Sequence, residues 1–130
     1  MPLQFADFCS QQLSIDKTPR IKIKRDPAWS RRAGTFGRYD PGTDTIEISV
    51  SKRHPVDVLR TLAHELVHFR QDEIEPLPPG AGETGSKWED QANALAGRIM
   101  RDFAEQNRSY FDQVKNTVTE SSGYIPVDDC

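Results

Sequence analysis

The stretch 61-TLAHELVHFRQ-71 contains two of the three histidines of the chain, with a glutamate directly after the first. Apolar residues recur along it at spacings of three and four, which predicts an amphipathic helix. His64 and His68 are four residues apart, so on a helix they lie nearly above one another and can turn imidazole nitrogens toward one ion. Glu65 projects beside that ion, where its carboxylate can take a proton from a bound water. The H-E-x-x-H pattern therefore predicts a zinc site with a catalytic carboxylate.

A catalytic zinc ion needs a third protein ligand, and Glu89 is the best candidate for it. Glu89 lies near the start of the next predicted helix, where Ala92 and Ala96 are small enough to let two helices approach closely. Ser86 and Glu89 also fit a capping box, in which the glutamate would instead bond backbone N–H groups at the helix start. Because the zinc site is otherwise incomplete, we favour the ligand role for Glu89.

Two other side chains near the pattern are weaker candidates as ligands. Asp72 follows His68 by four residues, but three ligands along one straight helix spread over about 12 Å of its axis, too far to converge on one ion. We expect Asp72 to be solvated or to support a ligand. His54 precedes Pro55 at the predicted start of the helix, and we expect it to be a helix-start residue.

The rest of the chain predicts a small α+β domain, with an antiparallel sheet of about three strands covered by helices on one side. The domain is expected to span residues 1–106, followed by a polar tail, 107–130, that is flexible or folded back on the domain. Periodicity and turn residues predict these elements: a helix over 3–15, a strand over 20–24, a hairpin of 34–39 and 44–50 around the turn 40–43, a helix over 55–74, a loop over 75–85 and a helix over 87–106.

Composition limits the class of protein. The chain has 130 residues, of which 35% are hydrophobic and 28% charged, as in one soluble domain, and we expect no membrane partner. The N-terminal stretch has no continuous apolar run and no cleavage site, so we expect a cytoplasmic protein. Cys9 and Cys130 are the only cysteines and do not form a disulfide framework.

Basic residues concentrate between Arg20 and Arg38, where seven Lys and Arg side chains stand against one acid, Asp26. We interpret this segment as the solvated face of a hairpin. The lesser alternatives are a surface for an acidic partner, for a nucleic-acid backbone, or for the acidic tail of the protein itself.

The segment 61–71, followed by 88-WEDQANALAG-97, resembles the gluzincin zinc metallopeptidases. The similarity is greatest to small single-domain members, the SprT-like, ImmA/IrrE-like and minimal gluzincin proteins of bacteria and phages, and it covers residues 34 to 104. It implies a zincin-like fold, zinc bound by His64, His68 and Glu89, and Glu65 as general base and acid. A phage origin would place the protein in the host-cell cytoplasm or the virion.

The resemblance also points to supporting residues. Larger gluzincins carry an acid four positions after the ligand glutamate, and Asn93 occupies that position here, where it can accept an imidazole N–H bond without charge. These enzymes often use a distal His or Tyr to stabilise the oxyanion of the transition state. No histidine follows His68, so Tyr39, Tyr110 and Tyr124 are the candidates, and the sequence does not choose among them.

The predicted function is that of a zinc-dependent peptidase. An extended peptide or protein substrate would add to an exposed edge of the hairpin through main-chain bonds, along 35–39 or 45–49. The second of these segments gives the substrate-edge candidates Thr45, Ile46, Glu47 and Ile48. The alternative is a non-catalytic zinc-containing module that binds protein or DNA, or is kept latent by its tail. Glu65 separates the two functions, because a purely structural zinc site has no use for its carboxylate.

Overall fold

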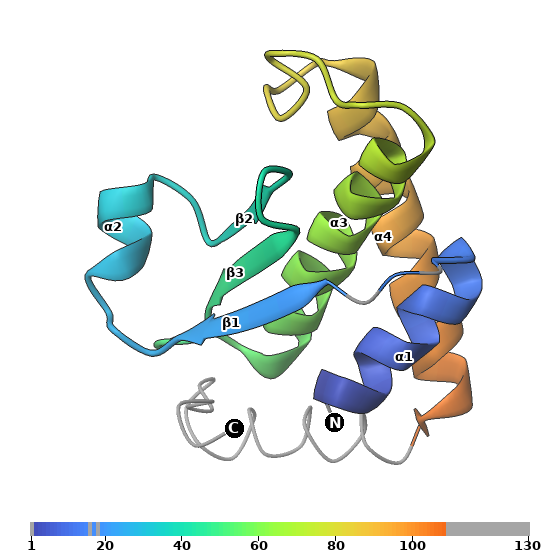
Figure 1. Ribbon diagram of the computed structural model, residues 1–130. Helices are drawn as coiled ribbons and strands as arrows, with labels where there is room; N and C mark the ends of the chain where they lie inside the picture. Colours follow the sequence, from blue (N-terminus) through green and yellow to red (C-terminus); the bar gives the residue numbers. More distant parts are fainter. Residues whose placement is uncertain (1, 16, 18, 109–130) are drawn as a thin grey trace.

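The computed structural model describes residues 2–15, 17 and 19–108, which form a small α+β fold (Figure 1). The elements in chain order are α1 (Pro2–Leu13), β1 (Arg20–Lys24), α2 (Trp29–Ala33), β2 (Gly37–Asp40), β3 (Thr45–Ser49), α3 (Pro55–Ile74) and α4 (Lys87–Gln106). The predicted helices over 55–74 and 87–106 are confirmed. The greater part of the predicted tail lies outside the described residues. Helix α2 was not predicted; it has five residues, no side-chain N-cap bond, and ends at Gly34 in the left-handed region.

The prediction of an antiparallel sheet is wrong for one of the two strand pairs. The strand order is β1-β3-β2, with β1 parallel and β2 antiparallel to β3, so the sheet is mixed. After β1 the chain passes through α2 to β2, which forms the far edge of the sheet, and β3 then lies between β1 and β2. Strand β3 is also the most buried of the three strands, which explains its central position.

This order also corrects the predicted substrate edge. Thr45, Ile46, Glu47 and Ile48 belong to β3, which pairs with a neighbour on each side and has no open edge for another strand. The edges of the sheet are β1 and β2. Of the two segments proposed for substrate pairing, only the one that contains β2 remains.

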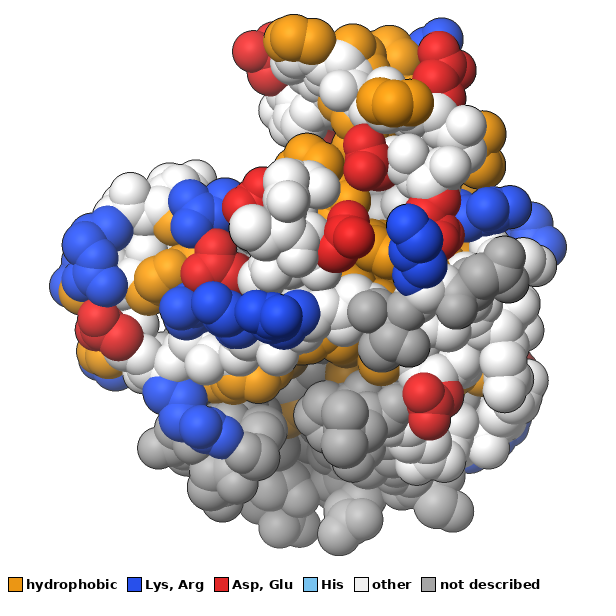
Figure 2. Space-filling model, in the orientation of Figure 1, with side chains coloured by type: hydrophobic (Ala, Val, Ile, Leu, Met, Phe, Trp, Pro, Cys, Tyr) orange, Lys and Arg blue, Asp and Glu red, His pale blue; other side chains and the backbone are white. Residues whose placement is uncertain are grey.

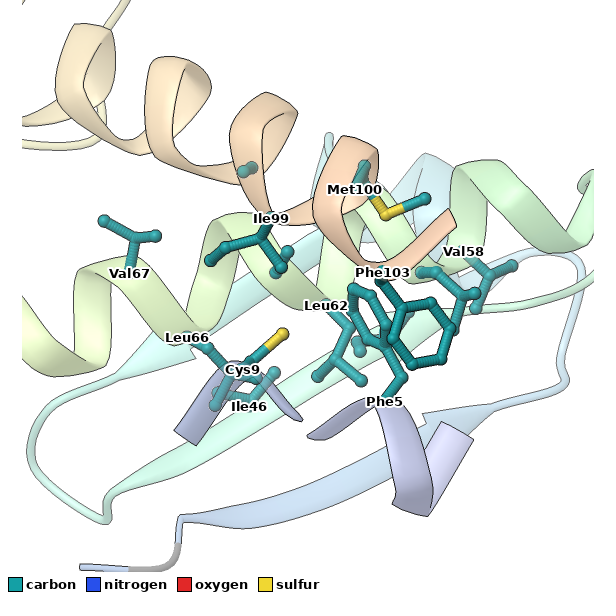
Figure 3. Packing of buried hydrophobic residues seen from close by; sticks show 14 of the residues in the cluster. Phe5, Cys9, Ile46, Val58, Leu62, Leu66, Val67, Ile99, Met100 and Phe103 are labelled. Atoms are coloured by element: carbon teal, nitrogen blue, oxygen red, sulfur yellow. The ribbon is translucent and has the colours of Figure 1, made fainter. Parts of the chain in front are cut away.

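Helices α1, α3 and α4 lie on one side of the sheet, with α3 between the sheet and α4 (Figure 1). In the core, the Phe5 and Phe103 rings meet edge to face at 4.8 Å between centroids, and Ile46 of β3 faces α3 (Figure 3). Cys9 is fully buried beside them, and this burial raises the pKa of its thiol to about 12. Cys9 is therefore a core residue, while Cys130 lies outside the described residues.

None of the helices in the described part of the chain has the length and hydropathy to cross a bilayer.

Strand β2 lies close against α3 at Gly37. A Cβ atom added there would collide with the Thr61 methyl group and lie 3.1 Å from Glu65 Oε2. Any side chain would therefore force Thr61 to move, or the strand to shift away from the helix. Glycine at this position lets an edge strand lie directly against the H-E-x-x-H helix.

We predict that Gly37→Ala lowers the free energy of unfolding by about 1–3 kcal/mol through this overlap. Adding Thr61→Ser should restore part of the loss, because serine lacks the methyl group but keeps the hydroxyl that accepts a 2.7 Å bond from Arg53. Gly82→Ala is the control, since an added Cβ there meets no atom within 4 Å. Urea unfolding measures all three; equal midpoints for the two alanine variants would contradict the prediction.

Candidate metal centre

Two helices contribute the atoms of the centre. His64 and His68 lie one turn apart on α3, with their Nε2 atoms 3.2 Å apart. Glu89, in the first turn of α4, places Oε2 3.0 Å from His64 Nε2 and Oε1 2.9 Å from His68 Nε2. The three side chains are each buried or partly buried, and one ligand atom from each lies within 4.8 Å of the others. This cluster could hold a metal ion.

The competing roles of Glu89 use different atoms. Ser86 caps α4 by accepting a 3.0 Å bond from the Glu89 backbone N–H. The Glu89 carboxylate does not complete the capping box, because the Ser86 N–H donates to the Glu83 carbonyl and the carboxylate faces the histidines. The cap fixes the first turn of α4 and thereby aims the carboxylate at the centre.

Gln71 fixes the tautomer of His68. The Gln71 amide nitrogen lies 3.0 Å from the Trp88 carbonyl oxygen, which can only accept, so the amide oxygen faces His68. The His68 Nδ1, 2.9 Å from that oxygen, therefore carries the hydrogen and donates it. In the neutral ring Nε2 then presents a lone pair to a Glu89 oxygen at 2.9 Å. A cation between these atoms relieves the repulsion between their lone pairs.

The separations of the ligand atoms also fit a tetrahedral ion. Bonds of about 2.05 Å place the corners of a tetrahedron about 3.3 Å apart. The separation is 3.2 Å between the two Nε2 atoms and 2.9 to 3.1 Å from Nε2 to the Glu89 oxygens. All three residues line one cleft, so a water or substrate in that cleft could reach an ion held by them.

Burial and the Glu89 charge set the protonation of the neighbouring groups. Burial lowers the pKa of His64 and favours the neutral ring that a metal requires, while the Glu89 carboxylate opposes this effect. Glu65 is 8% exposed, and its burial, followed by the Glu89 charge, raises the pKa of its carboxyl to about 8. Glu65 is therefore protonated below about pH 8 before a cation is bound, and a bound cation would lower this value.

The centre lies in a cleft of about 580 Å³. One wall is the segment Thr35 to Pro41, which contains β2; the other is the loop from Leu77 to Gly82 between α3 and α4. His64, Glu65 and His68 of α3 and Glu89 of α4 also line it. An extended chain in this cleft would lie between an edge strand and a proline-rich loop, over the candidate metal ligands.

Asp72 is not one of the three side chains that converge as candidate metal ligands. Its carboxylate accepts a 2.9 Å bond from the Tyr39 hydroxyl and a 3.0 Å bond from the Leu77 N–H, so it joins the two walls of the cleft. Tyr39 lines the cleft, but its hydroxyl is already used in this bond and in one to Asp44. Burial and Asp72 raise the pKa of Tyr39 far above its usual range. Its hydroxyl is thus placed as a wall contact rather than as an oxyanion donor.

The other predicted residues divide into three groups. His54 caps α3, because its Nδ1 accepts a 3.0 Å bond from the Val56 N–H, so its expected helix-start role is confirmed. Asn93 lies within hydrogen-bonding reach of His64. Tyr110 and Tyr124 lie outside the described residues.

Gln71 is the site residue that sequence reasoning missed. The available signal was its position three residues after His68 on the same helical face. Its role depends on the Trp88 carbonyl and on Gln91, which accepts a further 2.7 Å bond from its amide nitrogen. Both partners belong to α4, so the role became visible only once the two helices were placed together.

Comparison with protein-family models, with curated proteins and with solved structures gave no match to the chain. The gluzincin resemblance therefore stays a prediction from the motif residues. His64, His68 and Glu89 converge in the structure, and this convergence supports a metal centre.

We predict about one divalent metal ion per chain, which we expect to be zinc, and loss of most of it in Glu89→Ala because only two ligands remain. Plasma mass spectrometry of protein purified without added metal measures the content. Glu83→Ala, which alters an exposed loop glutamate, should keep the ion. Equal metal content in the Glu89→Ala and wild-type proteins, with the fold checked by circular dichroism, would exclude the three-ligand centre.

We further predict that Gln71→Met weakens zinc binding by about 10- to 100-fold, because His68 loses the acceptor that orients it. Gln71→Glu keeps an acceptor for the Nδ1 hydrogen and should retain more of the affinity. Gln91→Met, which removes only a partner of Gln71, should have a smaller effect. Competition with a chelator gives the affinities, and ¹⁵N NMR of the imidazoles reports the tautomer. Affinity within twofold of wild type in Gln71→Met would show that Gln71 has no such role.

Proposed function

We propose that the protein is a zinc-dependent peptidase, and the position of Glu65 is the observation that carries the proposal. Glu65 follows the ligand His64 directly and lines the same cleft, so its carboxylate adjoins the centre without being one of the three converging ligands. A structural metal site has no need of an additional buried carboxylate, which is costly to ionise away from water. Burial raises the pKa of this carboxyl to about 8 before a cation is bound, and a bound cation would lower it toward the range in which the carboxylate accepts a proton near neutral pH.

His64, His68 and Glu89 would hold the zinc ion, and Glu65 would move the proton. When bound, zinc lowers the pKa of water and polarises a carbonyl group. Glu65 accepts a proton from the attacking water while the water oxygen forms its bond to the scissile carbonyl carbon. Glu65 then delivers that proton to the amide nitrogen as the carbon–nitrogen bond breaks, so that a carboxylic acid and an amine leave.

The outer edge of β2 favours a peptide as the substrate, because its main-chain groups can pair with an extended chain. The Ser49 N–H donates to the Phe36 carbonyl, so by antiparallel alternation the main-chain groups of Gly37 and Tyr39 point away from β3. The Thr35 hydroxyl donates to the Gly37 carbonyl at 2.9 Å, a bond that an incoming peptide N–H can replace. An extended peptide paired with this edge would pass beside Glu65, which Gly37 approaches closely.

We predict that Glu65→Gln keeps the zinc ion but cleaves peptides at least about 100-fold more slowly, because glutamine cannot take the proton. Glu83→Gln, which changes an exposed glutamate on the loop, should cleave at the wild-type rate. Cleavage of a degenerate peptide mixture by zinc-loaded protein, followed by mass spectrometry, measures both. If wild type and Glu65→Gln hold zinc equally and neither cleaves, the proposal fails and a metal-containing binding module takes its place.

A further inference from the structure

The face of the sheet opposite the helices is basic. Arg20, Lys22 and Lys24 of β1 alternate with Ile21 and Ile23, which pack toward the core, so the three cations lie on the outer face. Arg38 of β2 lies on the same face, because it and Lys24 both contact Glu47 of β3. Lys and Arg side chains gather over the sheet and α2 on the left of the molecule, with acidic side chains between them (Figure 2).

Arg38 is the cation of this face that also lines the metal cleft. Its Nε and Nη2 donate to one Glu47 oxygen at 3.1 and 2.7 Å, and its guanidinium lies 5.8 Å from the centre of the Trp29 ring. These contacts hold the group in place while about half of the side chain, 52%, stays exposed. Glu47 is also paired with Lys24 at 3.2 Å, so one carboxylate faces two cations and a positive charge remains.

The pairing geometry connects this charge to the substrate. In a strand added to the edge of β2, the residue opposite Arg38 would point its side chain to the same outer face, about 5 Å away between Cβ atoms. Its two neighbours, opposite Gly37 and Tyr39, would point toward α3 and the metal ligands. The residue facing Arg38 would therefore lie within about two positions of the peptide bond that the water beside Glu65 would attack.

We infer that Arg38 selects peptide substrates with an aspartate or glutamate within about two residues of the cleaved bond, a specificity that rests on the proposed peptidase function. The guanidinium is held at the rim of the cleft, so binding an acidic side chain costs little ordering of Arg38. A basic substrate residue at the same place would meet the remaining positive charge of Arg38 and Lys24. A nucleic acid is the other anionic partner, but it has no strand to pair with the β2 edge that adjoins the metal ligands.

The test compares two fluorescent eight-residue peptides, alternating Ala-Asp and alternating Ala-Asn, for binding to zinc-loaded, full-length Glu65→Gln protein. An extended alternating peptide presents its acids on one face. We expect the Asp peptide to bind about three- to tenfold more tightly by fluorescence anisotropy. Adding Arg38→Gln should reduce the ratio to below about twofold, Arg38→Lys should keep part of it, and Arg38→Glu should reverse it toward an Ala-Lys peptide.

Arg32→Gln is the matched control, because Arg32 also pairs with a carboxylate, at 2.8 Å, and is 62% exposed, but does not line the cleft. It should leave the preference unchanged. Equal binding of the Asp and Asn peptides, or a preference that survives Arg38→Gln, would overturn the inference. The inference would also be overturned if a twelve-nucleotide single strand displaced the labelled Asp peptide from the wild-type Arg38 site at a lower concentration than unlabelled Asp peptide does.

Cleavage by the wild-type protein separates this inference from the function on which it rests. Cleavage of mixed peptides without enrichment of acids near the cut leaves the peptidase function standing and overturns the role of Arg38. Arg38-dependent binding of the Asp peptide without any cleavage supports the acidic specificity of the cleft and removes the peptidase function.

Discussion

Helices α3 and α4 pack through small side chains, and this close packing brings together the three candidate metal ligands. Ala92 and Ala96 of α4 are almost completely buried. Their small size lets the first turn of α4 approach the histidines, so that Glu89 comes within 3.1 Å of each. A larger residue at either alanine would push the two helices apart. The geometry of the centre is therefore a property of the helix interface as much as of the three ligands.

The same interface contains the polar contacts that orient the ligands. Gln71 spans it, accepting from His68 on α3 and donating to the main chain of α4 at Trp88. Ser86 fixes the start of α4 through its backbone bond to Glu89. His68 is thus bonded to a residue that contacts α4, Glu89 is bonded to the residue that caps its own helix, and Asn93 of α4 lies within hydrogen-bonding reach of His64. Pre-organisation of this kind lowers the cost of arranging ligands when an ion binds.

Local sequence patterns were sufficient to predict the long helices and the facing pair His64 and His68, because both are encoded within a few residues. Glu89 follows His68 by 21 residues and was favoured as the third ligand because a zinc site would otherwise be incomplete; the structure brings it to the histidines, and zinc binding by the three stays a prediction. The four-residue spacing of His64 and His68 and the polar start of α4 at Ser86 needed no knowledge of distant contacts. The sheet order did need such knowledge: alternation predicts strands, but whether Ile46 lies on an edge or in the centre depends on which strands compete for burial. The error at β3 and the missed role of Gln71 have this common cause, since each depends on partners far along the chain.

Asp72 joins the hairpin to the loop between α3 and α4 through Tyr39 and Leu77. The metal ligands lie on helices, whereas both walls of the cleft belong to a strand and a loop tethered at this one carboxylate. The loop residues 77–82 can therefore diverge in sequence without altering the ligand set. In evolutionary terms the cluster of candidate ligands and the wall of the cleft are separable here: the two helices can keep His64, His68 and Glu89 together while substitutions in a short surface segment change the shape of the cleft.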